Sequence, residues 1–312
     1  MQMLRTLSNQ PADHAATGEQ DYSKTPNQYV TVHGIRLAYR TIGYRTDAPP
    51  LVLFQHFTGT MDDWDQALIE DLAASRSVVV FENAGIGASE GQTPDSVATM
   101  AYYAVGFLDA LKLSNIDALG FSLGGAVVQQ VLADRPDLIR KAILVGTGPL
   151  GAEGFENLPN IIAANAKKSA ETNVPLKALL FFTSTPEGRQ AGIDFVKRIN
   201  NHTVEPEPVA TQEAIQAQAK AYVTWGLSPA NHAQLEAIKQ PVLIVNGNED
   251  QIAPTINSYV LYQHIPKAQL SLYPDSGHGS LFQHSKLFTS QANTFLDGVR
   301  SAACQAEGRP GA

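Results

Sequence analysis

Hydrophobic positions in this chain form short continuous runs that alternate with stretches of helical periodicity. Two β-rich runs, 30–32 and 35–42, flank a His-Gly turn and predict a hairpin. Six continuous apolar runs follow, at 51–54, 77–81, 115–121, 141–146, 240–247 and 268–274. Strands that are apolar on both faces belong in a sheet covered on both sides, which favours parallel pairing.

Helical patterns separate these runs. Apolar residues recur at helical spacing over 64–74, 95–111 and 124–136. A hairpin followed by repeated strand–helix units predicts an α/β fold with a mostly parallel, doubly wound sheet. Residues 150–236 break this rhythm and read as helical throughout. They are too many for one crossover, so we expect a helical cap inserted after the sixth strand, over the carboxyl edge of the sheet.

Four segments follow from this pattern. Residues 1–27 are predicted to form a flexible N-terminal tail, and residues 301–312 a flexible C-terminal tail. The α/β core is predicted in two pieces, 28–149 and 237–300, with the helical cap at 150–236 between them. The two tails are polar and aperiodic, which is typical of segments that bury little apolar surface.

The charge and composition of the chain argue against some classes of binding partner and indicate a cellular compartment. The net charge is −8 and no basic run of five or more occurs, which argues against nucleic acid and anionic membranes as partners. A single cysteine, Cys304, suits a reducing compartment. No signal-peptide core and no run of eighteen apolar residues is present. We therefore expect a cytoplasmic protein with a small-molecule substrate, and the sequence leaves its oligomeric state open.

Metal and nucleotide motifs are missing from the sequence. It contains no H-E-x-x-H, no paired Cys/His ligands and no G-x-G-x-x-G after a first strand. We expect chemistry without a metal or another cofactor.

Three residues with complementary chemistry follow three of the predicted strands. Ser122 follows 115–121, Asp250 follows 240–247, and His278 follows 268–274. Ligands bind outside the carboxyl ends of strands in open α/β sheets, so we expect these side chains to meet. A serine hydroxyl needs a neighbouring base, histidine can take and return its proton, and a carboxylate fixes the histidine tautomer.

The glycines beside Ser122 suit a sharp strand-to-helix turn. In "GFSLGG", at 120–125, small residues let the serine stand where a strand meets a helix. The oxyanion of a tetrahedral intermediate would then be held by the N–H of Leu123. A second donor, Phe57 or Thr58, would come from the loop "HFTGT" at 56–60.

These motifs resemble the α/β-hydrolase fold family. The resemblance covers about residues 28–300. It rests on four motifs: "FENAGIGAS" at 81–89, "GFSLG" at 120–124, "NGNEDQIAP" at 246–254 and "DSGHG" at 275–279. The chain is most similar to cofactor-free haloperoxidase-like serine esterases, which carry a cap after the sixth strand. The resemblance implies Ser122 as nucleophile, Asp250 as acid and His278 as base.

The sequence departs from the family pattern at three positions. Phe57 stands where a glycine is common, and alignment by position favours Thr58 as the second oxyanion donor. Glu82 stands in place of an aspartate and Ala84 in place of an arginine, which affects structure near the site more than its chemistry.

Other candidates for these roles fit less well. Glu249 and Asp275 also lie near the predicted acid and base, but Asp250 has the family's spacing to Pro254. His56 is near the site and is interpreted as an orienting or structural residue. It is also a tentative substrate contact, together with the apolar cap residues Phe181, Phe182 and Trp225.

The sequence therefore predicts a serine hydrolase that cleaves a carboxylic ester or lactone of a small to medium apolar substrate, through an acyl-enzyme on Ser122. The resemblance also implies perhydrolase or haloperoxidase activity, or hydrolysis of a carbon–carbon bond, as alternatives with the same triad. A ligand receptor that keeps the triad is an alternative of another class. Haloalkane dehalogenases and epoxide hydrolases of this fold use an aspartate where Ser122 stands.

Overall fold

The computed structural model describes residues 21–43, 46–201 and 206–298. Its strands are β1 Gln28–Val32, β2 Ile35–Ile42, β3 Leu51–Phe54, β4 Val78–Phe81, β5 Ile116–Phe121, β6 Ile139–Val145, β7 Val242–Gly247 and β8 Ala268–Tyr273. Its helices are α1 Gln66–Ala73, α2 Val97–Ala110, α3 Leu123–Asp134, α4 Leu158–Thr172, α5 Leu176–Phe181, α6 Pro186–Ile199, α7 Gln212–Leu227, α8 His232–Glu236, α9 Ile256–His264, α10 Ser280–Gln283 and α11 Ser285–Asp297. Short 3₁₀ helices are η1 Tyr22–Lys24, η2 Met61–Asp63 and η3 Phe155–Asn157.

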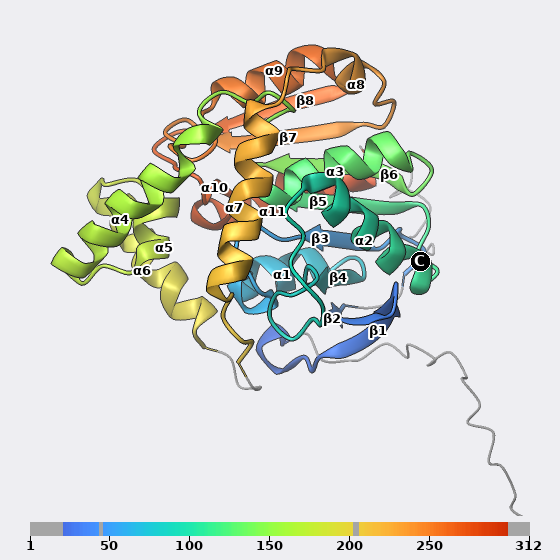
Figure 1. The fold of residues 1–312 in the computed structure, drawn as a ribbon, viewed down its shortest axis with the longest axis horizontal. Coiled ribbons are helices and arrows are strands. Elements are labelled where there is room, and N and C mark those ends of the chain that lie inside the picture. The colour runs from blue at the N-terminus through green and yellow to red at the C-terminus, as the bar shows by residue number, and fades with distance from the viewer. Residues whose placement is uncertain (1–20, 44–45, 202–205, 299–312) are drawn as a thin grey trace, which may run out of the picture.

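The strands form one sheet in the order β1-β2-β4-β3-β5-β6-β7-β8 (Figure 1). The predicted hairpin, β1 with β2, and the β2–β4 pair are antiparallel. Every later pair, from β3–β4 to β7–β8, is parallel. The predicted fold class is confirmed, and the parallel strands bring their carboxyl ends to a single edge.

Helices cover both faces of this sheet. The central strands β3, β4, β5 and β7 are buried at every position, as continuous apolar runs require. One face packs against apolar side chains of α2, α3 and α9. The other packs against α1 and α11. The two core layers hold the strand ends in fixed positions.

The segment between β6 and β7 is helical, at the place predicted for a cap. Figure 1 shows α4, α5 and α6 projecting beyond the sheet, while α7 runs back across the strand ends. Several polar contacts join this cap to the core: Arg198 Nη2 lies 2.6 Å from Asp65 Oδ2, and Thr183 Oγ1 donates to Asp275 Oδ1 at 2.8 Å. The backbone also takes part, since Gly279 N–H donates to Phe181 O at 2.8 Å.

Part of the predicted N-terminal tail is packed against the core. Tyr22, in η1, is fully buried, and its hydroxyl donates to the Met61 carbonyl at 2.7 Å. A large aromatic ring with a satisfied hydroxyl is enough to anchor a polar segment. Residues 1–20 and 299–312 lie outside the described residues, and with them Cys304 and the whole predicted C-terminal tail.

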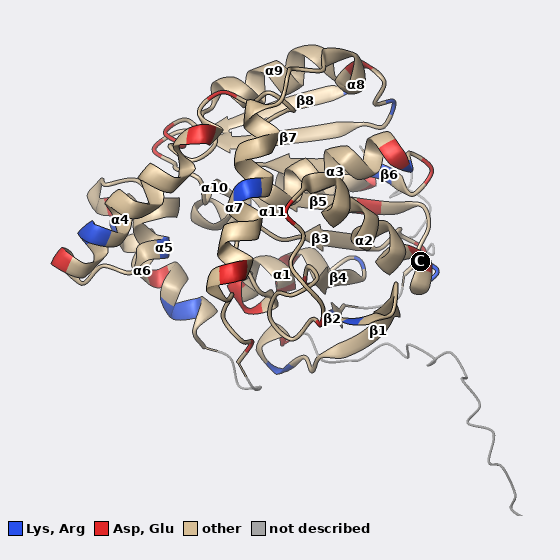
Figure 2. Ribbon diagram, in the orientation of Figure 1, with Lys and Arg blue, Asp and Glu red and all other residues tan. Residues whose placement is uncertain are grey.

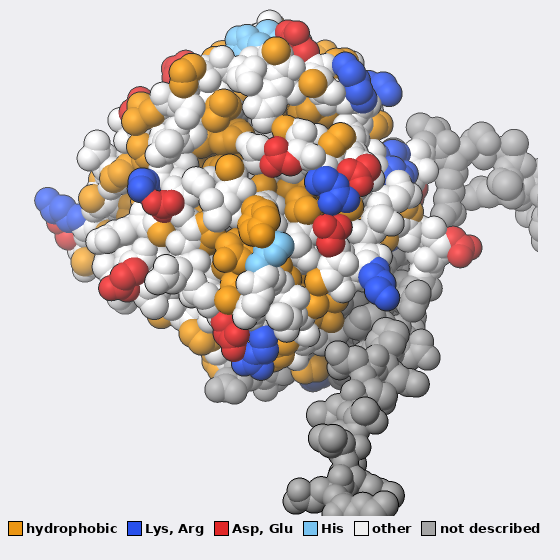
Figure 3. Space-filling model, turned by 45° about the vertical axis from the view of Figure 1, so that its right-hand side comes forward, with side chains coloured by type: hydrophobic (Ala, Val, Ile, Leu, Met, Phe, Trp, Pro, Cys, Tyr) orange, Lys and Arg blue, Asp and Glu red, His pale blue; other side chains and the backbone are white. Residues whose placement is uncertain are grey.

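Charged residues are spread over the molecule. Figure 2 shows Lys and Arg interspersed with Asp and Glu on helices and loops, with the sheet interior mostly uncharged. On the face in Figure 3, hydrophobic side chains alternate with polar and charged ones. Within the described residues, no helix has the length and apolarity needed to cross a membrane.

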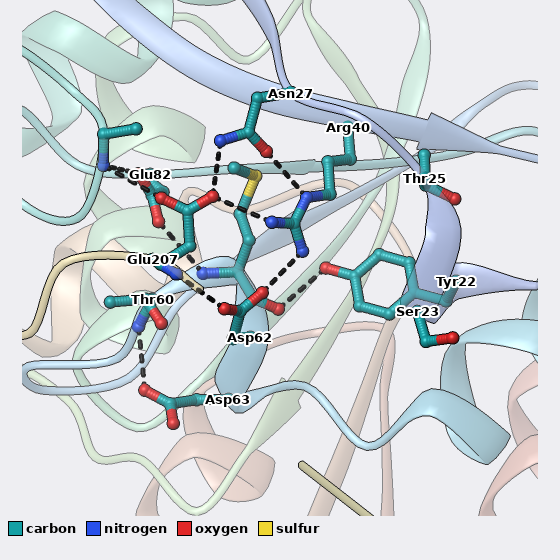
Figure 4. A network of polar contacts seen from close by, with 12 residues as sticks. Tyr22, Ser23, Thr25, Asn27, Arg40, Thr60, Asp62, Asp63, Glu82 and Glu207 are labelled. Carbon is teal, nitrogen blue, oxygen red and sulfur yellow. Dashed lines mark hydrogen bonds and ion pairs between the residues drawn. The ribbon is translucent and has the colours of Figure 1, made fainter. Parts of the chain in front are cut away.

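A buried cluster of charges fixes the chain just before α7 (Figure 4). The guanidinium of Arg40, on β2, lies 2.6 Å from Asp62 and 2.8 Å from Glu207. The Glu207 N–H donates to the second oxygen of Asp62 at 2.8 Å. Removing one member of such a buried pair is strongly destabilising, because its partner keeps an uncompensated charge. This cluster therefore anchors the start of the segment that leads into α7.

Glu82, just after β4, faces the same cluster. Its two oxygens accept the N–H groups of Met61 and Ala88 at 3.2 and 2.7 Å. The Ala88 N–H also donates to Glu207 at 3.0 Å, so the two carboxyl groups share one donor. Burial, followed by the charge of Glu207, raises the pKa of Glu82 to about 8. A Cβ on Gly87 would lie 2.0 Å from Glu82 Oε1, so position 87, next to this carboxyl group, must be glycine.

The raised pKa of Glu82 predicts a pH-dependent stability. An unfolded glutamate loses its proton near its ordinary pKa of 4.5, whereas folded Glu82 loses it near 8. Between these values the folded state binds more protons, so the free energy of unfolding falls as the pH rises. Glu82→Gln mimics the protonated form, and its melting temperature relative to wild type should increase from pH 6 to pH 9.

The matched control is Glu90→Gln, because Glu90 is an exposed carboxylate paired with Arg36. The Glu90 variant should show no comparable gain at high pH. If the Glu82 variant and wild type lose stability in parallel between pH 6 and pH 9, folded Glu82 does not titrate in this range and the interpretation is wrong.

Candidate active site

Three loops at the carboxyl edge of the sheet carry the predicted catalytic residues. Ser122 follows β5, Asp250 follows β7 and His278 follows β8. These strands are neighbours in the parallel part of the sheet, with β6 between β5 and β7. All three side chains are buried, with at most 6% of each residue exposed.

Ser122 sits in a strained turn between β5 and α3. Its φ of 57° and ψ of −119° are rarely adopted by a residue with a side chain. The packing around the turn enforces this conformation. The Ser122 N–H donates to Val145 O at 2.9 Å, and the Gly125 N–H donates to Ser122 O at 2.9 Å.

Two of the flanking glycines are required by close backbone contacts. A Cβ on Gly120 would lie 2.6 Å from Gly124 O, and one on Gly124 would lie 2.1 Å from Phe54 O. The first turn of α3 therefore rests directly on the end of β3. The sequence pattern around Ser122 has a steric cause.

Gly124→Ala should be strongly destabilising, because its new methyl group meets a backbone carbonyl that cannot move alone. We expect a loss of about 3 kcal/mol in the free energy of unfolding, measured with urea. Gly34→Ala is the control, because a Cβ there meets nothing within 4 Å and only its positive φ is unfavourable. That variant should lose only about 1 kcal/mol. Equal losses would show that the contact with Phe54 is not the constraint.

Asp250 and His278 are joined by a hydrogen bond. His278 Nδ1 lies 2.8 Å from Asp250 Oδ2. The other oxygen of Asp250 accepts the N–H groups of Ile252 and Ala253 at 2.8 and 2.9 Å. Because a carboxylate only accepts, the proton of neutral His278 lies on Nδ1 and a lone pair remains on Nε2. The arrangement leaves that nitrogen able to act as a base.

Ser122 and His278 line the same cavity, of about 200 Å³. Most of its wall is apolar and comes from the cap, with one residue from the loop after β3 and one from the loop after β7: Leu158, Ile162, Leu176, Leu180, Phe181, Ile215, Phe57 and Ile252. Its polar wall comprises Thr58, His56, Tyr222 and Lys177 besides the serine and histidine. Lys177 is ion-paired with Asp63, so its charge is already matched.

His56 is a buried, neutral member of this wall. Its Nδ1 lies 2.8 Å from the Phe57 carbonyl, which only accepts, so Nδ1 carries the proton. Burial lowers the pKa of His56 to about 4; Asp63 opposes this shift, and the charges of Lys177 and His278 reinforce it. The ring packs edge-on against Phe121 and Phe181, with centroids 5.3 Å apart in each case. His56 therefore packs into the wall beside the predicted catalytic residues, and its predicted orienting or structural role stays a prediction.

Two backbone segments offer donors for an oxyanion. The Leu123 N–H starts α3, beside Ser122. On the opposite loop, Thr58 has a φ of 59°, and its N–H donates to Gln218 Oε1 at 2.6 Å. Among the described residues, no acceptor partners the N–H of Phe57. The two predicted donors therefore differ. The Thr58 N–H is already hydrogen-bonded, whereas the Phe57 N–H has no acceptor among the described residues.

Two of the four tentative substrate contacts do not reach the cavity. Phe181 and His56 line it, but Phe182 packs against Phe195 with their ring centroids 5.4 Å apart. The Trp225 indole N–H donates to Gly148 O at 3.2 Å, at the far end of α7. Phe182 follows the last residue of α5, where the backbone becomes extended and turns the side chain away.

Two polar residues of α7 also reach the site: Tyr222 lines the cavity, and Gln218, which sequence reasoning missed, contacts Thr58. Tyr222 stacks on Phe155, with ring centroids 4.1 Å apart. Burial raises the pKa of its phenol well above the usual value, the charge of Asp250 adds to this, and Ser122 opposes it. Gln218 is fully buried one turn earlier. A glutamine within the apolar stripe formed by 214, 218, 221, 222 and 225 is the sequence signal that could have identified it.

Known proteins share this architecture. The family model described as alpha/beta hydrolase fold matches residues 49–285. An alpha/beta hydrolase fold protein from Chitinophaga pinensis is 40% identical, with 89% of this chain and 99% of that chain covered and a TM-score of 0.84. The enol-lactonase from Burkholderia xenovorans LB400 is similar in fold, at 21% identity, 86% and 100% coverage and a TM-score of 0.68.

A relative whose name states its substrate is less similar in sequence to this chain than the Chitinophaga pinensis protein is. The 2-hydroxymuconate semialdehyde hydrolase of Pseudomonas sp. (strain CF600) is 27% identical over 238 residues, which is 76% of this chain and 82% of that protein.

Proposed function

This chain belongs to the alpha/beta hydrolase fold family, and on that premise we propose that it is a serine hydrolase acting on a carboxylic ester or lactone of a small apolar acid. One observation carries the proposal. His278 is oriented by the buried carboxylate of Asp250 and lines the same apolar cavity as Ser122.

The proposed reaction has two halves. Nε2 of His278 takes the proton of Ser122 as Oγ attacks the carbonyl carbon, and the Leu123 N–H and a donor from 57–58 hold the oxyanion. The alcohol leaves with the proton from His278, so Ser122 becomes acylated. Water then loses a proton to His278 and attacks the acyl carbon. The acid departs as the proton returns to Ser122 Oγ.

Cavity size and polarity support a small acyl group. The cavity beside Ser122, about 200 Å³, is below the range of about 300–1,000 Å³ typical of sites for drug-sized ligands. A second cavity, of about 430 Å³, shares Thr58, Lys177 and Ile215 with the first and adds polar groups such as Asp62 and Asp63. The acyl part would occupy the inner cavity, and the alcohol part would extend toward the outer one.

Hydrolysis of a carbon–carbon bond is the second candidate, favoured by the relative named 2-hydroxymuconate semialdehyde hydrolase. The inner cavity supports it less well than ester cleavage. Lys177 is the sole Lys or Arg among the described residues of that wall, and it is ion-paired with Asp63, which leaves little to attract an anionic substrate.

Labelling with a fluorophosphonate tests the nucleophile. The reagent should modify Ser122, found by mass spectrometry of the labelled peptide, because only a serine with a working base reacts. Ser122→Ala should abolish labelling and lower kcat for p-nitrophenyl acetate by about 10⁴-fold or more. Ser258→Ala, a buried serine on α9, is the control and should leave both unchanged. Labelling at another residue, or none in wild type, would overturn the proposal.

A substrate panel tests the cavity. Among p-nitrophenyl esters, kcat/KM should be highest for acetate to butyrate and should fall about tenfold or more for decanoate, because the long chain does not fit the inner cavity. The panel includes lactones, and 2-hydroxymuconate semialdehyde as the carbon–carbon substrate. Faster turnover of that compound than of any ester or lactone would favour the second candidate.

A further inference from the structure

Tyr222, on α7, brings an unused hydroxyl group to the cavity beside Ser122. The residue is fully buried and lines that cavity. Its Oη makes no hydrogen bond of good geometry with any of the described residues. A buried hydroxyl without a partner is unfavourable, so the fold alone would be better served by a phenylalanine at this position. The hydroxyl is therefore available to a group that enters the cavity.

The phenol of Tyr222 is a rigidly held donor. Its ring stacks on Phe155, with centroids 4.1 Å apart and planes 10° apart. The helix packs so closely there that a Cβ on Gly226 would lie 2.4 Å from Phe155 Cβ. Burial, and then the charge of Asp250, raise the pKa of the phenol well above its usual value, and Ser122 opposes this. The hydroxyl thus keeps its proton at neutral pH and can donate a hydrogen bond, but it cannot act as a base.

The contacts of α7 show on which side of Ser122 this hydroxyl lies. The helix crosses the strand ends (Figure 1), with Gln218 on the loop after β3 and Trp225 on the loop after β6. Tyr222 lies between them, about 6 Å beyond Gln218 along the helix axis. The charge of Asp250, after β7, acts on its phenol. Tyr222 is therefore on the side of the serine toward β6 and β7, away from the loop after β3.

An ester or lactone presents two oxygens at its carbonyl carbon. The carbonyl oxygen faces the Leu123 N–H and the loop after β3, where the Phe57 N–H has no acceptor among the described residues. The alkoxy oxygen, which leaves, then points to the other side, toward the base His278. An alkoxy oxygen has lone pairs enough to accept from His278 and from Tyr222 together.

We propose that Tyr222 donates a hydrogen bond to the alkoxy oxygen of the substrate, and so favours esters and lactones of aliphatic alcohols. The inference rests on the proposed function. The bond between the carbonyl carbon and the alkoxy oxygen breaks, and the oxygen keeps the electron pair and takes the proton from His278 Nε2. Tyr222 keeps its own proton and stabilises the charge that develops on the oxygen. This help matters most for an aliphatic alkoxide, which is a poor leaving group, and least for p-nitrophenolate, which spreads its charge over the ring.

Three acetate esters test this role in Tyr222→Phe. The ethyl, phenyl and p-nitrophenyl esters give the same acyl-enzyme, so their kcat/KM values differ only through the leaving group. The variant should lose about tenfold or more in kcat/KM for ethyl acetate, less for phenyl acetate and less than about twofold for p-nitrophenyl acetate. Fluorophosphonate labelling of Ser122 should keep its rate, because the departing fluoride is weakly basic.

The stability of the variant is a second readout. Tyr222→Phe should have a melting temperature equal to or above that of wild type, because it removes a buried hydroxyl that has no partner in the described part of the chain. The matched control is Tyr39→Phe, which removes the hydroxyl of another buried tyrosine, on β2 and packed against Phe107. That control should keep the wild-type ratio of the three rates.

The outcomes separate this inference from the proposed function. Equal losses for all three acetates would place the hydroxyl at the carbonyl oxygen, and unchanged rates would exclude it from the reaction. A variant that does not fold would show that the hydroxyl supports the structure. Each of these results overturns the proposed donor while Ser122 remains the labelled nucleophile of the wild type. Failure of the wild type to label at Ser122 would instead overturn the proposed function.

Discussion

The whole site depends on how closely the first turn of α3 approaches the end of β3. No side chain fits at Gly124, because a Cβ there would lie 2.1 Å from the carbonyl oxygen of Phe54. That contact brings the Leu123 N–H beside the loop that follows β3, so the two segments that carry the proposed oxyanion donors meet at one backbone junction. The cost is the positive φ of Ser122, which persists because buried packing and hydrogen bonds leave the turn no alternative.

The cap is positioned by a different kind of force. Apolar packing in the two core layers is non-directional, whereas the Arg40–Glu207 and Arg198–Asp65 pairs each require one geometry. Buried ion pairs add little net stability because desolvation offsets their attraction. We infer that these pairs serve to fix the orientation of the cap, including the face of α7 that carries Tyr222 into the cavity beside Ser122.

Local patterns in the sequence were sufficient for the framework of the molecule. Apolar runs and helical spacing predicted the parallel sheet and the hairpin, because each pattern reports the burial of its own element. The same logic located Ser122, Asp250 and His278 at strand ends, and parallel topology brings those ends to one edge. Asp250 and His278 are hydrogen-bonded there, as expected from their positions.

The pocket could not be read from the sequence in the same way. Its wall depends on how α4 to α7 pack on one another, which no local pattern encodes. Phe181 and Phe182 are adjacent and equally apolar, yet the end of α5 sends only Phe181 to the cavity. Trp225 lies on the same helix as Tyr222 but contacts Gly148 instead. In the predicted N-terminal tail, the polar composition gave no sign that the ring of Tyr22 is fully buried against the core.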